Sequence, residues 1–91
     1  MSTYRGKNGA IAFLQVSGKV AGYAYGDDLA GNPALFKLIS TTATGDVTVT
    51  YADGTTDTDI DVQVLSDMNA IVRKVVAGST PVLITDFGLY R

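Results

Sequence analysis

Residues 46–65, which read DVTVTYADGTTDTDIDVQVL, predict a β-hairpin. In the first part, residues 46–52, valine, valine and tyrosine alternate with threonine, and a period of two is typical of a strand with one buried face. Asp53-Gly54 follows, and an Asp-Gly pair between two such runs indicates a tight turn. We therefore expect residues 56–65 to return beside the first strand. The residues expected to face the core on the return are Ile60, Val62 and Val64.

Further short runs of apolar and β-branched residues lie on both sides of this hairpin. The expected strands are 10–16, 20–25, 34–40, 46–52, 56–65, 68–77 and 82–87. Residues 68–77 also show apolar side chains at helical spacing, but their β-branched content favours a strand. Ser17-Gly18-Lys19 is expected to turn the first strand into the second, with a positive φ at Gly18.

The length and these patterns predict a single domain covering residues 1–91. We expect a small antiparallel β-sandwich or barrel of about seven short strands, because turn residues recur at short intervals. Residues 1–8 are mostly polar and are expected to form an N-terminal arm.

The composition excludes several kinds of site. The chain has 46% hydrophobic and 18% charged residues, which is typical of a globular domain, and it contains no Cys, no His and no Glu. It therefore cannot form a disulfide, a zinc site built from Cys or His, or a catalytic pair that uses His as the base. We expect no enzyme activity, no cofactor and no metal.

The charge pattern argues against two further classes of partner. The net charge is −2, and the seven Lys and Arg residues are scattered, with only Arg73 and Lys74 adjacent, so we expect no nucleic-acid binding. Uncharged stretches such as residues 8–18 are shorter than the ~20 residues that a membrane span needs. Lys19 also follows the apolar run of residues 10–16 closely, so we expect no secretion signal.

Asp57, Asp59 and Asp61 form the sharpest polar pattern. An EF-hand calcium loop fails here, because Val62 stands where its glycine belongs and Met68 where its last acid belongs. The favoured interpretation is a solvated strand face that discourages edge pairing. The alternatives are a metal site that stabilises the fold, and cross-strand ion pairs with Arg73 and Lys74. The adjacent acids Asp27-Asp28 are interpreted as a solvated turn.

The five tyrosines allow two interpretations. Tyrosine has an apolar ring and a polar tip, and it is common in cores and at protein interfaces. Aromatic faces also stack on sugar rings, so an exposed tyrosine platform could bind carbohydrate. We favour a core or interface role over sugar binding.

Three segments of the second half resemble small head proteins of tailed bacteriophages and gene-transfer agents, in particular the head spike base family. The segments are Thr44–Thr50 with Asp53-Gly54, Ala70–Thr80, and Gly88–Tyr90. The shared features are a Gly-Asp start to a strand, an Asp-Gly turn, a β-branched strand that carries Arg, a Gly-Thr turn and a terminal Leu-Tyr. The first half departs from this family, and residues 5–18 resemble tail-tube subunits instead.

The resemblance implies a structural virion protein, made in the host cytoplasm and placed on the capsid surface. Such a capsid decoration or cement protein, or head spike base, would form a homo-oligomer (a trimer or pentamer) and bind the major capsid protein to stabilise the head or mount a fibre. The alternatives are a carbohydrate-binding or adhesion domain and a tail-tube-like component. The candidate interface residues are Tyr4, Arg5, Lys7, Tyr23, Tyr25, Arg73, Lys74 and Tyr90.

Overall fold

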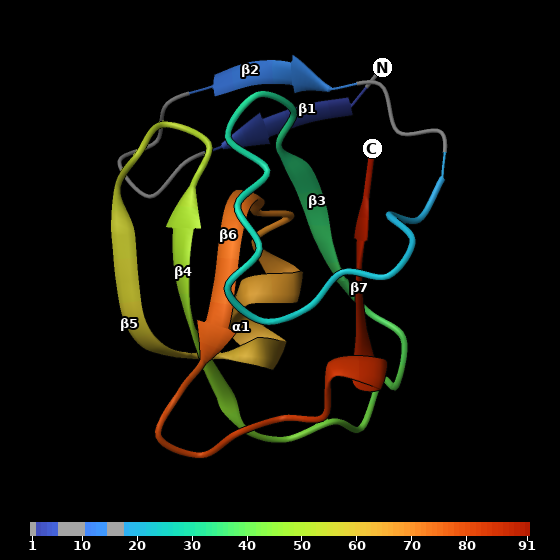
Figure 1. Cartoon of the computed structure of the whole chain (residues 1–91), viewed down its shortest axis with the longest axis vertical. Coiled ribbons are helices and arrows are strands. Elements are labelled where there is room, and N and C mark those ends of the chain that lie inside the picture. The colour runs from blue at the N-terminus through green and yellow to red at the C-terminus, as the bar shows by residue number, and fades with distance from the viewer. Residues whose placement is uncertain (1, 6–10, 15–17) are drawn as a thin grey trace.

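Five antiparallel strands form the main sheet, in the order β5-β4-β6-β3-β7 (Figure 1). The structure, a computed structural model, describes residues 2–5, 11–14 and 18–91. A second sheet contains β1 and β2, which pair antiparallel with each other. The elements in chain order are β1 (Ser2–Arg5), β2 (Ile11–Leu14), β3 (Ala34–Leu38), β4 (Asp46–Tyr51), β5 (Thr56–Asp61), α1 (Val62–Asp67), β6 (Ile71–Ala77), η1 (Ile84–Asp86) and β7 (Phe87–Tyr90). The prediction of a small, single-domain, all-β fold is confirmed.

The predicted hairpin of β4 and β5 is also confirmed. Val47, Val49 and Tyr51 are fully buried, as their alternation predicted. The turn closes where the Gly54 N–H donates to the Tyr51 carbonyl at 2.9 Å. Gly54 has a φ of 87°, which most residues with a side chain avoid. The Asp-Gly pair therefore fixes the register of the two strands locally.

The core lies between the main sheet and the short helix α1, which packs against β3. The rings of Phe36 and Phe87, on neighbouring strands, stack with their centroids 4.9 Å apart. Val62 and Leu65 of α1 are fully buried. The remaining buried side chains of this cluster are Ala34, Ala43, Val47, Val49, Tyr51, Ala70, Val72, Val75, Val82 and Leu89.

The helix α1 corrects the prediction that residues 56–65 form one strand. The strand ends at Asp61, whose carboxylate accepts hydrogen bonds from the N–H groups of Gln63 (2.8 Å) and Val64 (3.4 Å). This N-cap satisfies N–H groups that the first turn of a helix leaves unpaired. Val62 stays buried, but Val64 is 51% exposed because the helical turn rotates it away from the core. The predicted inward position of Val64 is therefore wrong.

The predicted hairpin of residues 10–16 and 20–25 is wrong. β2 pairs with β1, and residues 20–25 form no strand. The positive φ values in this part of the chain fall at Gly22 (66°) and Gly26 (91°), not at Gly18, and they bend the backbone out of an extended path.

Two further predictions concern the C-terminal half. The choice of strand over helix for residues 68–77 is confirmed, because β6 covers Ile71–Ala77. The predicted strand 82–87 is wrong, since the Asp86 N–H bonds back to the Leu83 carbonyl at 2.9 Å and closes a single 3-10 turn. The last strand begins only at Phe87, where it pairs with Leu38.

Candidate functional site

Residues 18–30 form backbone hydrogen bonds with β7 at one end and with β6 at the other. We call this segment the strap (cyan in Figure 1). At its first end, the Gly18 N–H donates to the Arg91 carbonyl at 3.1 Å, and the Arg91 N–H donates to the Gly18 carbonyl at 2.9 Å. The Val20 N–H donates to the Leu89 carbonyl at 2.7 Å. The strap therefore begins as a short antiparallel extension of the main sheet beyond β7.

The second end of the strap pairs with β6. The Gly26 N–H donates to the Val75 carbonyl at 2.9 Å, and the Leu29 N–H donates to the Arg73 carbonyl at 2.6 Å. β3 pairs with β6 only at Val72 and Ile71. The strap thus takes the place of a strand along the rest of this edge of β6.

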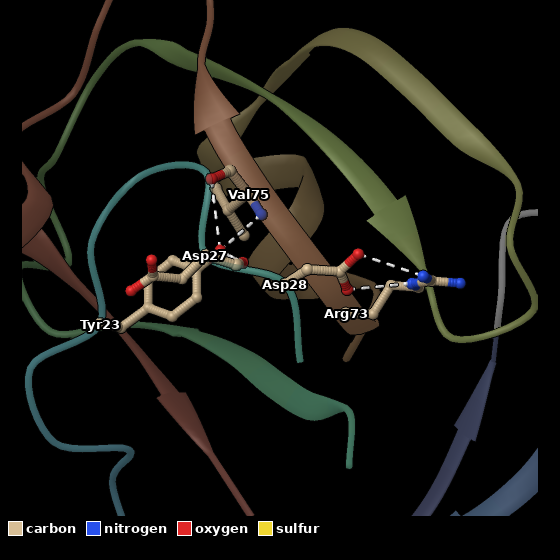
Figure 2. Close-up of polar contacts among 5 residues, drawn as sticks. All are labelled: Tyr23, Asp27, Asp28, Arg73 and Val75. Atoms are coloured by element: carbon tan, nitrogen blue, oxygen red, sulfur yellow. Dashed lines mark hydrogen bonds and ion pairs between the residues drawn. The ribbon is translucent and has the colours of Figure 1, made fainter. Parts of the chain in front are cut away.

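Tyr23 fastens the middle of the strap to β6 through its hydroxyl (Figure 2). The hydroxyl accepts a hydrogen bond from the Val75 N–H at 2.8 Å and donates to the Asp27 carbonyl at 2.5 Å. It supplies the acceptor that a neighbouring strand would otherwise offer to Val75. Burial raises the pKa of the Tyr23 hydroxyl, which favours the protonated form that donates this hydrogen bond.

Tyr25 turns inward as well. Its hydroxyl donates to the Val82 carbonyl at 2.6 Å, and its ring lies 5.8 Å from the ring of Phe87 at a tilt of 49°. The side chains of Tyr23 and Tyr25 are both partly buried against the core. The inward position of Tyr23 and Tyr25 therefore argues against an exposed platform for stacking on sugar rings.

An ion pair joins the strap to β6 at Asp28 (Figure 2). Arg73 donates from Nε to Asp28 Oδ1 at 3.2 Å and from Nη2 to Oδ2 at 3.1 Å, which is a bidentate pair. The hydrogen bonds from Arg73 lower the pKa of the Asp28 carboxyl. The alternative in which Arg73 forms cross-strand ion pairs with the aspartates of β5 is wrong, because β4 lies between β5 and β6.

Asp27 closes the turn that the sequence predicted. Its N–H donates to the Ala24 carbonyl at 3.0 Å, and its carboxylate accepts from the Ala24 N–H at 3.0 Å. The two adjacent acids thus have different partners, one within the turn and one on β6.

The three aspartates of the polar pattern, Asp57, Asp59 and Asp61, have separate structural partners. Asp57 accepts a hydrogen bond from the buried Tyr51 hydroxyl at 2.8 Å, and Asp61 caps α1. Asp59 has a φ of 53° and accepts from both the N–H and the hydroxyl of Ser79 at 2.8 Å. These bonds from Ser79 lower the pKa of the Asp59 carboxyl.

A shallow groove of about 180 Å³ lies beside the strap, between its first residues and the start of β7. Its volume is below the roughly 300–1,000 Å³ of small-molecule pockets. It is lined by Lys19, Val20, Gly22, Tyr23, Ile84, Thr85, Phe87, Gly88 and Leu89.

The structure brings together part of the predicted interface set. Tyr23, Arg73 and Lys74 lie at the junction of the strap and β6, where Lys74 stands opposite Asp28. Tyr90 lies in β7, opposite Lys19 of the strap. Tyr4 and Arg5 lie in β1, and Lys7 lies outside the described residues. Sequence reasoning missed Asp28 as the partner of Arg73, and no local pattern joins residues so far apart in the chain.

Metal sites and membrane spans are two further kinds of feature to consider in residues 2–5, 11–14 and 18–91. In this part of the chain no group of three or more carboxylates could hold a metal ion. The helices found there are too short and too polar to cross a bilayer. Comparisons with protein-family models, curated proteins and solved structures gave no match for the chain. The candidate site is a set of hydrogen bonds and an ion pair that join the strap to β7 and β6.

Proposed function

We propose that this chain is a structural virion protein of a tailed bacteriophage, either a capsid decoration or cement protein or a head spike base. In this role it forms a homo-oligomer and binds the major capsid protein. The observation that carries the proposal is the resemblance of Thr44–Thr50, Ala70–Thr80 and Gly88–Tyr90 to small phage head proteins. These segments contain most of β4, β6 and β7. All three strands belong to the main sheet, so the segments that carry the resemblance are parts of one sheet.

Exposed apolar side chains support a role in assembly. The large hydrophobic residues that are most exposed in the described part of the chain are Ile39 (47%), Val64 (51%), Met68 (38%) and Leu83 (69%). Ile39 and Leu83 lie near each other at one end of the sheet, because the Asp86 carbonyl accepts from the Ile39 N–H and the Asp86 N–H donates to the Leu83 carbonyl. Apolar groups grouped on a surface are typical of protein interfaces.

Co-expression with the major capsid protein of the same genome tests this proposal. We expect the chain to sediment with assembled shells in a fixed ratio to the capsid protein. Leu83→Ser is expected to lower that ratio, while the neighbouring control Thr85→Ser leaves it unchanged. Shells that sediment without any of the chain would contradict the proposal.

A further inference from the structure

The turn between β4 and β5 contains a peptide bond that can rearrange chemically. The side-chain carboxyl group of an aspartate can react with the backbone nitrogen of the next residue to form a succinimide ring. The reaction is fastest when that residue is glycine, because glycine has no side chain to crowd the nitrogen. The chain has nine aspartates and no Glu, and Asp53 is the one that glycine follows.

The structure leaves Asp53 and Gly54 open to water. Both residues are exposed. A Cβ atom placed at Gly54 would meet nothing within 4 Å apart from its chain neighbours, so no other segment of the described chain covers the glycine. Water can therefore reach the carboxyl group and the ring that it would form.

Three hydrogen bonds of the turn hold the groups that would react. The Gly54 N–H donates to the Tyr51 carbonyl at 2.9 Å. Asp53 Oδ1 accepts from the Thr55 N–H at 3.1 Å and from the Thr55 hydroxyl at 2.6 Å. The nitrogen must lose its proton and the carboxyl group must turn toward it before the ring can close. These hydrogen bonds therefore oppose the reaction in the folded chain.

We propose that Asp53 is a site of spontaneous isoaspartate formation, and that the Thr55 hydroxyl slows the reaction in the folded chain. The Gly54 nitrogen forms a bond to Cγ of the protonated Asp53 carboxyl group and loses its proton. The Cγ–OH bond breaks, and one water molecule leaves. This inference does not depend on the proposed virion role.

A water molecule then opens the ring in one of two ways. Cleavage of the bond between the Gly54 nitrogen and Cγ restores aspartate. Cleavage of the bond between that nitrogen and the main-chain carbonyl carbon of Asp53 leaves isoaspartate. One water molecule leaves and one returns, so the product has the mass of the original chain.

Isoaspartate would disturb the hairpin, because its backbone runs through the side chain of residue 53 and is one carbon atom longer. Across this turn the Tyr51 N–H donates to the Thr55 carbonyl at 2.7 Å. Tyr51 is fully buried, so a longer turn would displace the pairing of a core residue. We therefore expect the isomerised chain to be less stable than the original.

Incubation at neutral pH tests the proposal, with the chain either folded or unfolded in guanidinium chloride. Peptides are separated by liquid chromatography, and electron-transfer fragmentation locates isoaspartate. We expect isoaspartate at residue 53, with a rate about tenfold lower in the folded chain, because hydrogen bonds must break first. Deamidation at Asn8-Gly9 would raise the mass and is therefore distinguished. Equal rates in the two states, or isoaspartate at other aspartates and not at residue 53, would overturn the proposal.

Two variants separate the Thr55 hydroxyl from the rest of the turn. Thr55→Val removes the hydroxyl but keeps the N–H and the branched shape, whereas Thr55→Ser keeps the hydroxyl. When folded, Thr55→Val should form isoaspartate about fivefold faster than the wild type, and Thr55→Ser at close to the wild-type rate. When unfolded, all three chains should react at one rate. Equal rates for the three folded chains would overturn the role of Thr55.

The isomerised chain is also isolated and unfolded in guanidinium chloride. We expect a lower midpoint than for the original chain, because the turn no longer fits the register of β4 and β5. Equal midpoints would contradict the predicted disturbance of the hairpin.

Discussion

At the residue scale, Tyr23 makes the clearest single contribution, because its hydroxyl is the acceptor for the Val75 N–H. Tyr23→Phe would leave that part-buried N–H without its acceptor. We expect the free energy of unfolding to fall by about 1–3 kcal/mol, the usual cost of an unsatisfied buried donor. Urea denaturation measures the change. Tyr90→Phe, on β7 opposite Lys19 of the strap, is the control and should cost less than Tyr23→Phe.

The Asp28–Arg73 pair predicts an acid sensitivity of the strap. Arg73 lowers the pKa of Asp28 in the folded chain below the ordinary value of 3.8. The folded state therefore binds fewer protons than the unfolded state just below pH 3.8, and stability falls as the pH falls through the folded pKa. Above pH 3.8 this contribution is fully present.

Asp28→Asn should remove this part of the pH dependence. Thermal unfolding of the wild type and the variant between pH 7 and pH 2 measures it, with Asp67→Asn on α1 as the control. We expect the curve for Asp28→Asn to be flatter than the other two at the acid end. Three parallel curves would show that the ion pair does not contribute to stability.

At the scale of elements, α1 depends on its N-cap. Asp61→Ala removes the acceptor for the N–H groups of Gln63 and Val64, and we expect a loss of about 1 kcal/mol. Asp61→Asn keeps an acceptor oxygen and should restore most of this stability. Thermal melts of the two variants give the comparison, and equal melting temperatures for Asp61→Ala and the wild type would contradict it.

The β4–β5 hairpin could be predicted from sequence because its signals are local. Alternation over residues 46–51 and the Asp53-Gly54 turn lie within a few residues of the contacts they determine. The helix α1 could not, because it carries two β-branched valines, and its cap depends on the side chain of Asp61 turning back on the chain.

The strap was mistaken for a strand of a local hairpin for a different reason. Its bonds join Tyr23 to Val75 and Asp28 to Arg73, and nothing near Tyr23 or Asp28 in the sequence indicates either partner. Gly22 and Gly26 take positive φ there because the path must bend from one strand edge to another. Predicting this segment requires the three-dimensional sheet order.

At the scale of the whole molecule, the candidate site is the set of contacts that join the strap to β7 and β6. The predicted interface residues Tyr23, Arg73 and Lys74 gather at the junction of the strap and β6. Leu83 is 69% exposed, and its neighbour Val82 accepts the hydrogen bond from the Tyr25 hydroxyl of the strap.

The molar mass of the full chain in solution tests the central claim most directly. Size-exclusion chromatography with multi-angle light scattering is run over a hundredfold range of concentration. We expect a mass of at least twice the 9.5 kDa of one chain, in a whole number of chains, which persists as the concentration falls. A mass of 9.5 kDa at every concentration would contradict it.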